Sequence, residues 1–247
     1  MITVVKIGGN VIGDEGSLQA FCRDFASMPR PKILVHGGGP LAAEMQERLG
    51  ITPVRIEGRR VTDADTLRIV TMVYAGWCNK HIVALLQGFG CDAIGLSGCD
   101  ASCITAEKRA PRLLSDGSGT VDYGFVGDVR PESVRVKFVQ SLLDRGLTPV
   151  FTAINHDGHG QLLNTNADTM AASVAAAMGA RLRFRFEKRG VLDESGSVIP
   201  LIDSQSCASL KASGTVSGGM LPKLDNAFAA LRAGVPEVFI GETRICL

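Results

Sequence analysis

The chain lacks an excess of charge of either sign and lacks a long hydrophobic run. Lys plus Arg number 26 against 25 Asp plus Glu among 247 residues, which gives a net charge of +1. This balance offers no electrostatic basis for binding nucleic acid or an acidic membrane surface. No apolar run approaches the about 18 residues that cross a bilayer, and the first residues read as a strand rather than as a signal segment. We therefore expect a cytoplasmic protein with no nucleic-acid or membrane partner.

The cysteines lack the arrangement of a disulfide framework or a metal site. There are seven of them, an odd number, and only Cys99 and Cys103 lie close together in the sequence. No second pair or nearby histidine completes a metal site there, and His156 and His159 stand in a glycine-rich loop without a third ligand. We expect free thiols in a reducing compartment and no metal bound directly by protein side chains.

Aromatic residues are also scarce, at 5%, whereas 29 glycines supply many turns. Apolar strand patterns alternate with helical ones, for example a helix over 18–25, a strand over 91–96 and a strand over 147–154. Such alternation favours an α/β fold whose mainly parallel sheet is covered on both faces. Residues 181–187 differ, because three arginines alternate with three apolar residues, a pattern that is not typical of a strand buried on both faces.

Three glycine-rich turns are the main candidates for a functional site. Residues 33–40 run an apolar strand through His36 into three glycines, and Pro40 then begins a helical pattern. Bare backbone N–H groups at the start of a helix favour a bound phosphate. Two similar turns carry lysines: Gly8 and Gly9 follow Lys6, and Gly218 and Gly219 precede Lys223. The first two turns and Lys6 suggest phosphoryl transfer, although any one turn alone is about equally well explained as a tight connection between a strand and a helix. The third turn again has a lysine.

Other glycine motifs fit less well. No Gly-Lys-Ser/Thr follows the glycines as in a P-loop, and the dinucleotide-binding G-x-G-x-x-G pattern is missing. The His-Gly-Gly-Gly run also occurs in lipases and esterases, which need a Gly-x-Ser-x-Gly nucleophile. The nearest candidate, around Ser97, lacks the second glycine in its place.

Two polar segments precede predicted helices. Arg60 stands just before a helix predicted over 63–87 with a bend near Gly76, an exposed position from which a guanidinium can hold a carboxylate with two hydrogen bonds. Thr62 and Asp65 have the spacing of a capping box for that helix. Farther on, Asn166 fits as the N-cap of an alanine-rich helix and Asp168 as an acid in its first turn.

Five short motifs follow one another in the order found in the amino-acid kinase family, and together they resemble that family over essentially the whole chain. The resemblance implies a three-layer αβα sandwich with an open, mainly parallel sheet of about eight strands. An N-terminal lobe over 1–172 would bind an acylated amino acid and form a homodimer, and a C-terminal lobe over 173–247 would bind ATP. The motifs are Lys-Ile-Gly-Gly (6–9), Val-His-Gly-Gly-Gly (35–39), Gly-Arg-Arg-Val-Thr (58–62), Asn-Thr-Asn-Ala-Asp (164–168) and Gly-Gly-Met-Leu-Pro-Lys (218–223).

The branch of the family that fits best phosphorylates the side-chain carboxylate of an N-acyl-L-glutamate in arginine biosynthesis. By this resemblance Lys6 and Lys223 stabilise the transferring phosphoryl group, and Asp168 organises both lysines. Mg²⁺ would be held mainly through the phosphates of ATP and water. The expected substrate-binding residues are Gly38, Gly39, Arg60 and Asn164, and the expected nucleotide-binding residues are Gly8, Gly9, Glu187, Gly190, Val216 and Ser217.

Three departures from the family pattern leave alternatives open. Residues 186–189 read Phe-Glu-Lys-Arg where the family has a Thr/Ser-Asp motif, and the segment after Val238 is short. No helix precedes Ile2, where relatives carry the extension tied to hexamers and arginine inhibition, so we expect a dimer insensitive to arginine. A catalytically weak amino-acid-binding or regulatory relative, or a kinase for N-acyl-aminoadipate, remains possible from the sequence. Whether the acyl group is acetyl or succinyl is also open.

Overall fold

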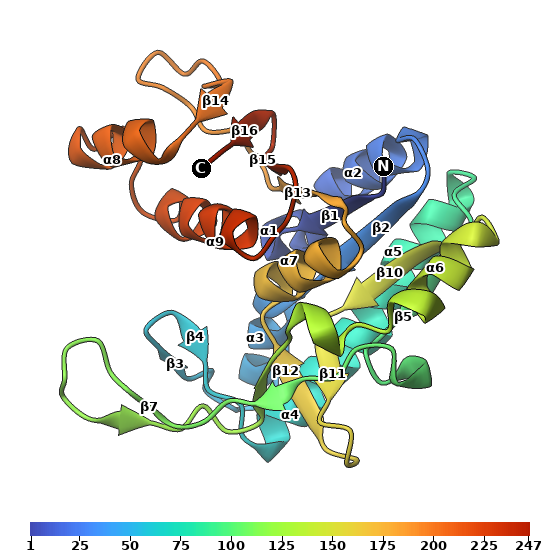
Figure 1. Cartoon of the computed structure of the whole chain (residues 1–247). Helices are drawn as coiled ribbons and strands as arrows, with labels where there is room; N and C mark the ends of the chain where they lie inside the picture. The colour runs from blue at the N-terminus through green and yellow to red at the C-terminus, as the bar shows by residue number, and fades with distance from the viewer.

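The computed structural model describes all 247 residues and is organised around one eight-stranded sheet (Figure 1). Every neighbouring pair of strands is parallel except the β15 and β16 pair. The α/β fold and the eight-stranded, mainly parallel sheet expected from the sequence are thus confirmed. In spatial order the strands are β14 (Leu201–Ile202), β16 (Thr243–Ile245), β15 (Val238–Ile240), β13 (Arg181–Arg185), β1 (Thr3–Ile7), β2 (Lys32–His36), β10 (Thr148–Thr152) and β5 (Ala93–Leu96).

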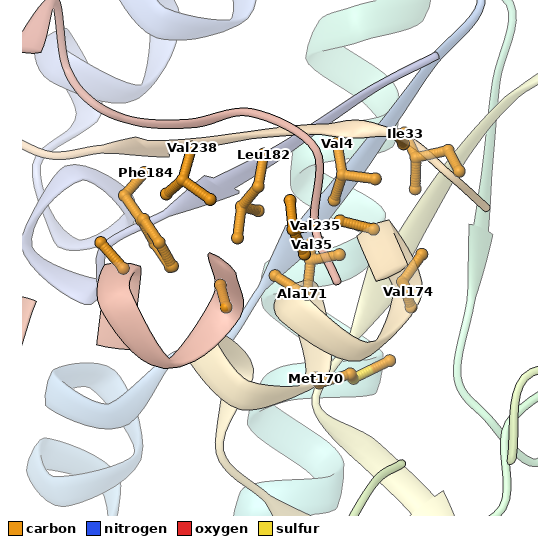
Figure 2. Close-up of a cluster of buried hydrophobic side chains, with 14 of the residues drawn as sticks. Val4, Ile33, Val35, Met170, Ala171, Val174, Leu182, Phe184, Val235 and Val238 are labelled. Carbon is orange, nitrogen blue, oxygen red and sulfur yellow. The ribbon is translucent and has the colours of Figure 1, made fainter. Parts of the chain in front are cut away.

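Every residue of β2 and β10 is buried, including the polar residues at their ends, because helices cover both faces of these central strands. One core of 34 buried residues lies between the sheet and α6, α7, α8 and α9, and Figure 2 shows Val4, Leu182 and Val238 on adjacent strands facing Ala171. A second core of 22 buried residues lies on the opposite face. The helices are α1 (Gly9–Gly13), α2 (Glu15–Ser27), α3 (Gly39–Arg48), α4 (Ala64–Thr71), α5 (Asn79–Gly88), α6 (Val136–Asp144), α7 (Ala167–Ala177), α8 (Ser204–Ala212) and α9 (Met220–Arg232).

The C-terminal half of the sheet is fully buried on one face only. In β13 the buried residues Leu182 and Phe184 alternate with three half-buried arginines, and β15, β16 and β14 show the same alternation. In Figure 1, α7 and α9 lie on one side of β13 and β15. The arginine pattern of residues 181–187 therefore marks a strand with one open face, as predicted.

One continuous helical stretch joins α4, a π-helical segment (Met72–Cys78) and α5. The predicted bend at Gly76 thus falls within a π-helix. The stretch Ala64–Gly88 is long and apolar enough to cross a membrane by length and composition alone, but 44% of its most apolar window is buried inside the protein. Its buried side chains, including Val70 and Ile82, belong to the second core, as in a core helix.

The N-cap of α4 is Asp63 rather than Thr62. The Asp63 carboxylate accepts a hydrogen bond of 2.8 Å from the Thr66 amide, whereas the Thr62 hydroxyl accepts one of 3.0 Å from the side chain of Asn164. The predicted capping box was therefore wrong, because the Thr62 side chain bonds to Asn164, far along the chain, instead of capping α4. The N-cap role of Asn166 at α7 is confirmed, since its side chain accepts from the amides of Asp168 and Thr169.

Smaller strands surround the site. The sheet β11-β12-β9-β6 has a hairpin whose tip contains His159, as predicted for residues 155–160, and no group of three metal-binding side chains occurs. Before β6 the chain forms a 3-10 turn (Asp100–Ser102) followed by isolated bridges at Ile104 and Thr105. The lobe boundary predicted after residue 172 lies inside α7 and stays a prediction. The small strands are β3 (Arg55–Ile56), β4 (Arg59–Arg60), β6 (Glu107–Lys108), β7 (Arg112–Leu113), β8 (Thr120–Val121), β9 (Val126–Asp128), β11 (Ile154–His156) and β12 (Leu162–Thr165).

Candidate active site

A cavity of about 320 Å³ opens where β1, β2 and β12 end. Parallel strands place their carboxyl ends at one edge of the sheet, and this edge of an α/β sheet is where ligands commonly bind. The structure therefore brings together motifs that are far apart in the sequence. Among the residues expected at the site, Lys6, Gly9, Gly38, Gly39, Arg60, Asn164 and Asp168 line the cavity.

The glycines of the first two turns are required by close packing. A Cβ on Gly38 would lie 2.7 Å from a ring carbon of Tyr74 and 3.0 Å from the sulfur of Cys78. A Cβ on Gly9 would lie 2.5 Å from the ring of Pro40, so the turns after β1 and β2 touch each other. No side chain caps α3, which leaves the amides of its first turn available to a ligand.

His36 holds the second turn in place and is not a proton donor for catalysis. Its ring is fully buried; Nδ1 lies 2.8 Å from the Gly37 carbonyl oxygen, and Nε2 accepts a hydrogen bond of 3.0 Å from the Asn79 amide group. Burial lowers the pKa of His36 to about 4. The ring is therefore neutral at physiological pH, and its contact with the Gly37 carbonyl orients the backbone of the glycine turn.

This neutral histidine makes the stability depend on pH. Between about pH 6.5 and 4 the unfolded chain binds a proton at His36 that the folded chain does not bind. We expect the free energy of unfolding to fall by about 3 kcal/mol from this group as the pH drops through that range. Urea unfolding of the wild type and of His36→Gln at pH 7 and pH 4.5 measures this change. The free energy of unfolding should fall less between the two pH values in the variant than in the wild type. His159→Gln, at an exposed loop tip, serves as the control and should behave as the wild type does. An equal fall in the free energy of unfolding in all three proteins would contradict the expectation.

Lys6 and Asp168 form the central ion pair of the site. The Lys6 ammonium lies 2.7 Å from one Asp168 oxygen, and both side chains are mostly buried, with 16% and 24% of their surface exposed. Asp168 also accepts a hydrogen bond of 3.3 Å from Asn226 of α9. Asp168 thus joins β1, α7 and α9, and it directs the Lys6 charge toward the cavity.

Lys223 lies in α9, one turn before Asn226, but it does not contact Asp168. Its ammonium donates to the Gly219 carbonyl oxygen at 3.1 Å and lies 4.8 Å above the ring of Phe186. Phe186 directly follows β13, so Lys223 is near the same edge of the sheet as Lys6 without lining the cavity.

Arg60 is buried rather than exposed, which corrects the sequence interpretation. Only 8% of its surface is accessible, because its guanidinium donates to the Gln46 side chain of α3 and, at 2.9 Å, to the Gly39 carbonyl oxygen. These interactions link Arg60 to the second glycine turn, and Arg60 also lines the cavity with N–H groups left over for a ligand. Asn164 is also buried, and it donates to Thr62.

Nearly the whole sequence matches the model of one protein family. Residues 1–242 match the amino acid kinase family. The chain belongs to this family. It is 47% identical to the acetylglutamate kinase of Cytophaga hutchinsonii over 96% of this chain and 89% of that protein. It is 45% identical to the acetylglutamate kinase of Bacteroides thetaiotaomicron over 97% of this chain and 92% of that protein.

Solved structures share the fold of this chain. The smu.665 protein of Streptococcus mutans is 26% identical and superposes with a TM-score of 0.76 over 99% of this chain and 98% of that one. Carbamate kinase from Giardia is 13% identical, with a TM-score of 0.65 over 99% of this chain and 98% of the other. At that level of identity the second likeness concerns the fold alone.

The residues expected to bind nucleotide in this amino acid kinase do not all line the same cavity. Val216 and Ser217 line a separate cavity of about 300 Å³ beside Lys188. Glu187 is exposed, and Gly8 is the N-cap residue of α1. Gly190 is buried, since a Cβ there would lie 2.8 Å from Thr243 and from Val198. Gly190 is therefore needed for packing, and its nucleotide-binding role stays a prediction.

The cavity also contains residues that the sequence analysis did not single out. Tyr74 reaches it from the π-helix, and three further arginines line it, namely Arg55, Arg59 and Arg109. Asn226, which contacts Asp168, was missed as well. Of these residues, Arg59 could have been predicted from the sequence, because it stands next to Arg60 in the Gly-Arg-Arg segment.

Proposed function

We propose that this protein transfers the γ-phosphoryl group of ATP to the side-chain carboxylate of an N-acyl-L-glutamate, forming an acyl phosphate for arginine biosynthesis. The observation that carries this proposal is the Lys6 and Asp168 pair placed beside two touching glycine turns in one cavity with Arg60 and Asn164. Relatives at 42–47% identity that carry the name acetylglutamate kinase support it.

The reaction needs charge neutralisation and positioning rather than a base, because the attacking carboxylate is already ionised. A carboxylate oxygen forms a bond to the γ-phosphorus while the bond from that phosphorus to the oxygen of ADP breaks. Lys6 and Lys223 stabilise the negative charge spread over the transferring group, and Asp168 positions Lys6. Arg60 binds the α-carboxylate, Asn164 binds the acylamino group, and the amides of the glycine turns hold phosphoryl or carboxylate oxygens.

ATP would bring Mg²⁺ to this site. Asp168 is the only carboxylate lining the cavity and is paired with Lys6, and no cluster of three metal-binding side chains exists. These residues fit an ion held by phosphate oxygens and water, as Mg²⁺ usually is in kinases. Its charge would add to that of the lysines.

A coupled assay of ADP release tests the proposal directly. The substrates are N-acetyl-L-glutamate, N-succinyl-L-glutamate, L-glutamate and N-acetyl-aminoadipate, and we expect turnover with the acylglutamates well above that with the other two. Turnover with none of them would favour the alternative of an amino-acid-binding or regulatory protein. Preference for N-acetyl-aminoadipate would show that the proposed substrate is wrong and that the proposed phosphoryl transfer is right.

We further propose a cytoplasmic homodimer formed through the N-terminal half. All seven cysteines are free, which fits a reducing compartment. Met72 and Trp77, with 59% and 64% of their surface exposed, lie on the π-helical segment within the long helical stretch, and large exposed apolar side chains often mark an interface.

Trp77→Asp is expected to convert the dimer into a monomer in light scattering at micromolar concentration, because it would place an unpaired charge in the interface. Leu113→Asp provides the matched control, since Leu113 is equally exposed, at 66%, but lies in β7. A wild-type monomer, or a Trp77→Asp protein that remains a dimer, would contradict this interface.

A further inference from the structure

Three of the cationic side chains that line the cavity have no role in the proposed function. Five cationic side chains line it, but it has one carboxylate, Asp168, which Lys6 already neutralises. In the proposed function Arg60 binds the α-carboxylate of the substrate, and Lys6 stabilises the transferring phosphoryl group. The cations left over are Arg55, Arg59 and Arg109.

Arg59 is the cation of this group with no partner at all. Arg109 forms a two-point ion pair with Asp128, and Arg55 donates to the Gly58 carbonyl oxygen at 3.3 Å. By contrast, the Arg59 guanidinium has neither a hydrogen bond nor a carboxylate within 4.0 Å. Partial burial, and the positive charges of Arg109 and Arg112, lower the pKa of Arg59. An anion binding there would relieve this repulsion.

The position of Arg59 relative to Asn164 indicates which part of the substrate it meets. Val126 pairs in register with Asn164, and its carbonyl oxygen accepts a hydrogen bond of 2.8 Å from the Arg109 amide. The Arg109 guanidinium lies 5.6 Å from the centroid of the Tyr123 ring. The Tyr123 hydroxyl donates at 3.3 Å to the carbonyl oxygen of Ile56, the residue that pairs with Arg59 across β3 and β4. The two arginines therefore lie on the side of the cavity next to Asn164, toward which an acyl group held at its acylamino end would extend.

We propose that the preferred substrate has a carboxylate on its acyl group, as in N-succinyl-L-glutamate, and that Arg59 binds this additional carboxylate. The proposal rests on the proposed function and specifies its substrate. An acetyl group ends in a methyl and leaves Arg59 without a partner, whereas a succinyl group carries a carboxylate two methylenes beyond its carbonyl. N-acetyl-L-glutamate remains a substrate, with a lower kcat/KM.

The test compares two substrates that differ only at the end of the acyl group. N-succinyl-L-glutamate is matched with its terminal amide, N-succinamoyl-L-glutamate, and kcat/KM is measured for both by ADP release. We expect the wild type to favour the carboxylate by about fivefold, about 1 kcal/mol, in the range of an exposed ion pair. Arg59→Gln should bring the ratio close to one while KM for ATP stays unchanged. The control is Arg232→Gln, at an exposed arginine of α9, which should keep the wild-type ratio.

The outcomes separate this inference from the proposed function. Turnover of N-acetyl-L-glutamate with no preference for the terminal carboxylate in the wild type overturns the inference and leaves the kinase reaction standing. An Arg59→Gln protein that keeps the ratio, or whose KM rises for ATP instead, overturns the role of Arg59. Turnover with no acylglutamate overturns both.

Discussion

Replacing Lys6 by alanine is expected to lower kcat by about 10²-fold or more, with a smaller effect on KM for the acylglutamate. The Lys6 ammonium lies 2.7 Å from Asp168 at the end of β1, where it can neutralise charge that grows on the phosphoryl oxygens as the reaction proceeds. An interaction that strengthens in the transition state acts mainly on kcat. Steady-state ADP release measures both constants.

Lys223→Ala is expected to cause a similar loss, although Lys223 contacts Gly219 and the Phe186 ring rather than Asp168. The matched control is Lys137→Ala, at an exposed position of α6, and it should leave kcat within about twofold of the wild type because surface charges far from a site act weakly. A near-normal kcat in Lys6→Ala would remove Lys6 from the catalytic machinery. The same result in Lys223→Ala would leave Lys6 as the only catalytic cation.

Arg60→Ala is expected to raise KM for the acylglutamate at least about tenfold, which corresponds to about 1.4 kcal/mol, and to leave KM for ATP nearly unchanged. The α-carboxylate that Arg60 is proposed to bind carries the same charge before and after phosphoryl transfer. Its binding energy therefore contributes equally to the ground state and the transition state and appears in KM. Arg60→Lys should recover only part of the loss, since lysine lacks the planar pair of donors.

The burial of Arg60 requires a stability measurement beside the kinetics. Its removal leaves acceptors on Gln46 and Gly39 without a donor, so the free energy of unfolding should fall by about 1–3 kcal/mol. Gln46→Leu removes one of these contacts and leaves Arg60 in place, which separates lost stability from lost binding. A flat KM in a folded Arg60→Ala protein would end the assignment of the α-carboxylate to Arg60.

Local patterns made part of this site predictable. The glycine turns follow apolar runs, so the sequence already indicated that Gly9 and Gly38 stand where strands of a parallel sheet end. The alternation in β13 likewise revealed a strand with one open face, because period two in a strand reports directly on burial. Lys6 and Asp168 were linked by resemblance, and the structure places them in direct contact.

Contacts between distant segments account for what the sequence did not reveal. Arg60 was expected to be exposed, but Gln46 of α3 and the backbone of Gly39 surround its guanidinium, and no periodicity records such a meeting. Thr62 has the sequence spacing of a capping box, but in the structure its hydroxyl accepts a hydrogen bond from Asn164, which is 102 residues later. Asn226 was missed because an asparagine in the middle of a helix is ordinary until its partner, Asp168, is known.

The contact between Gly9 and Pro40 implies that the two positions cannot vary independently during evolution. The Pro40 ring occupies the space that a side chain at position 9 would need, at 2.5 Å from the Cβ. In a homologous chain, a smaller residue must replace the proline at position 40 before an alanine can replace the glycine at position 9. In the reverse order the intermediate would be overpacked. The order in which these two substitutions can accumulate is therefore constrained by the packing of the two turns against each other.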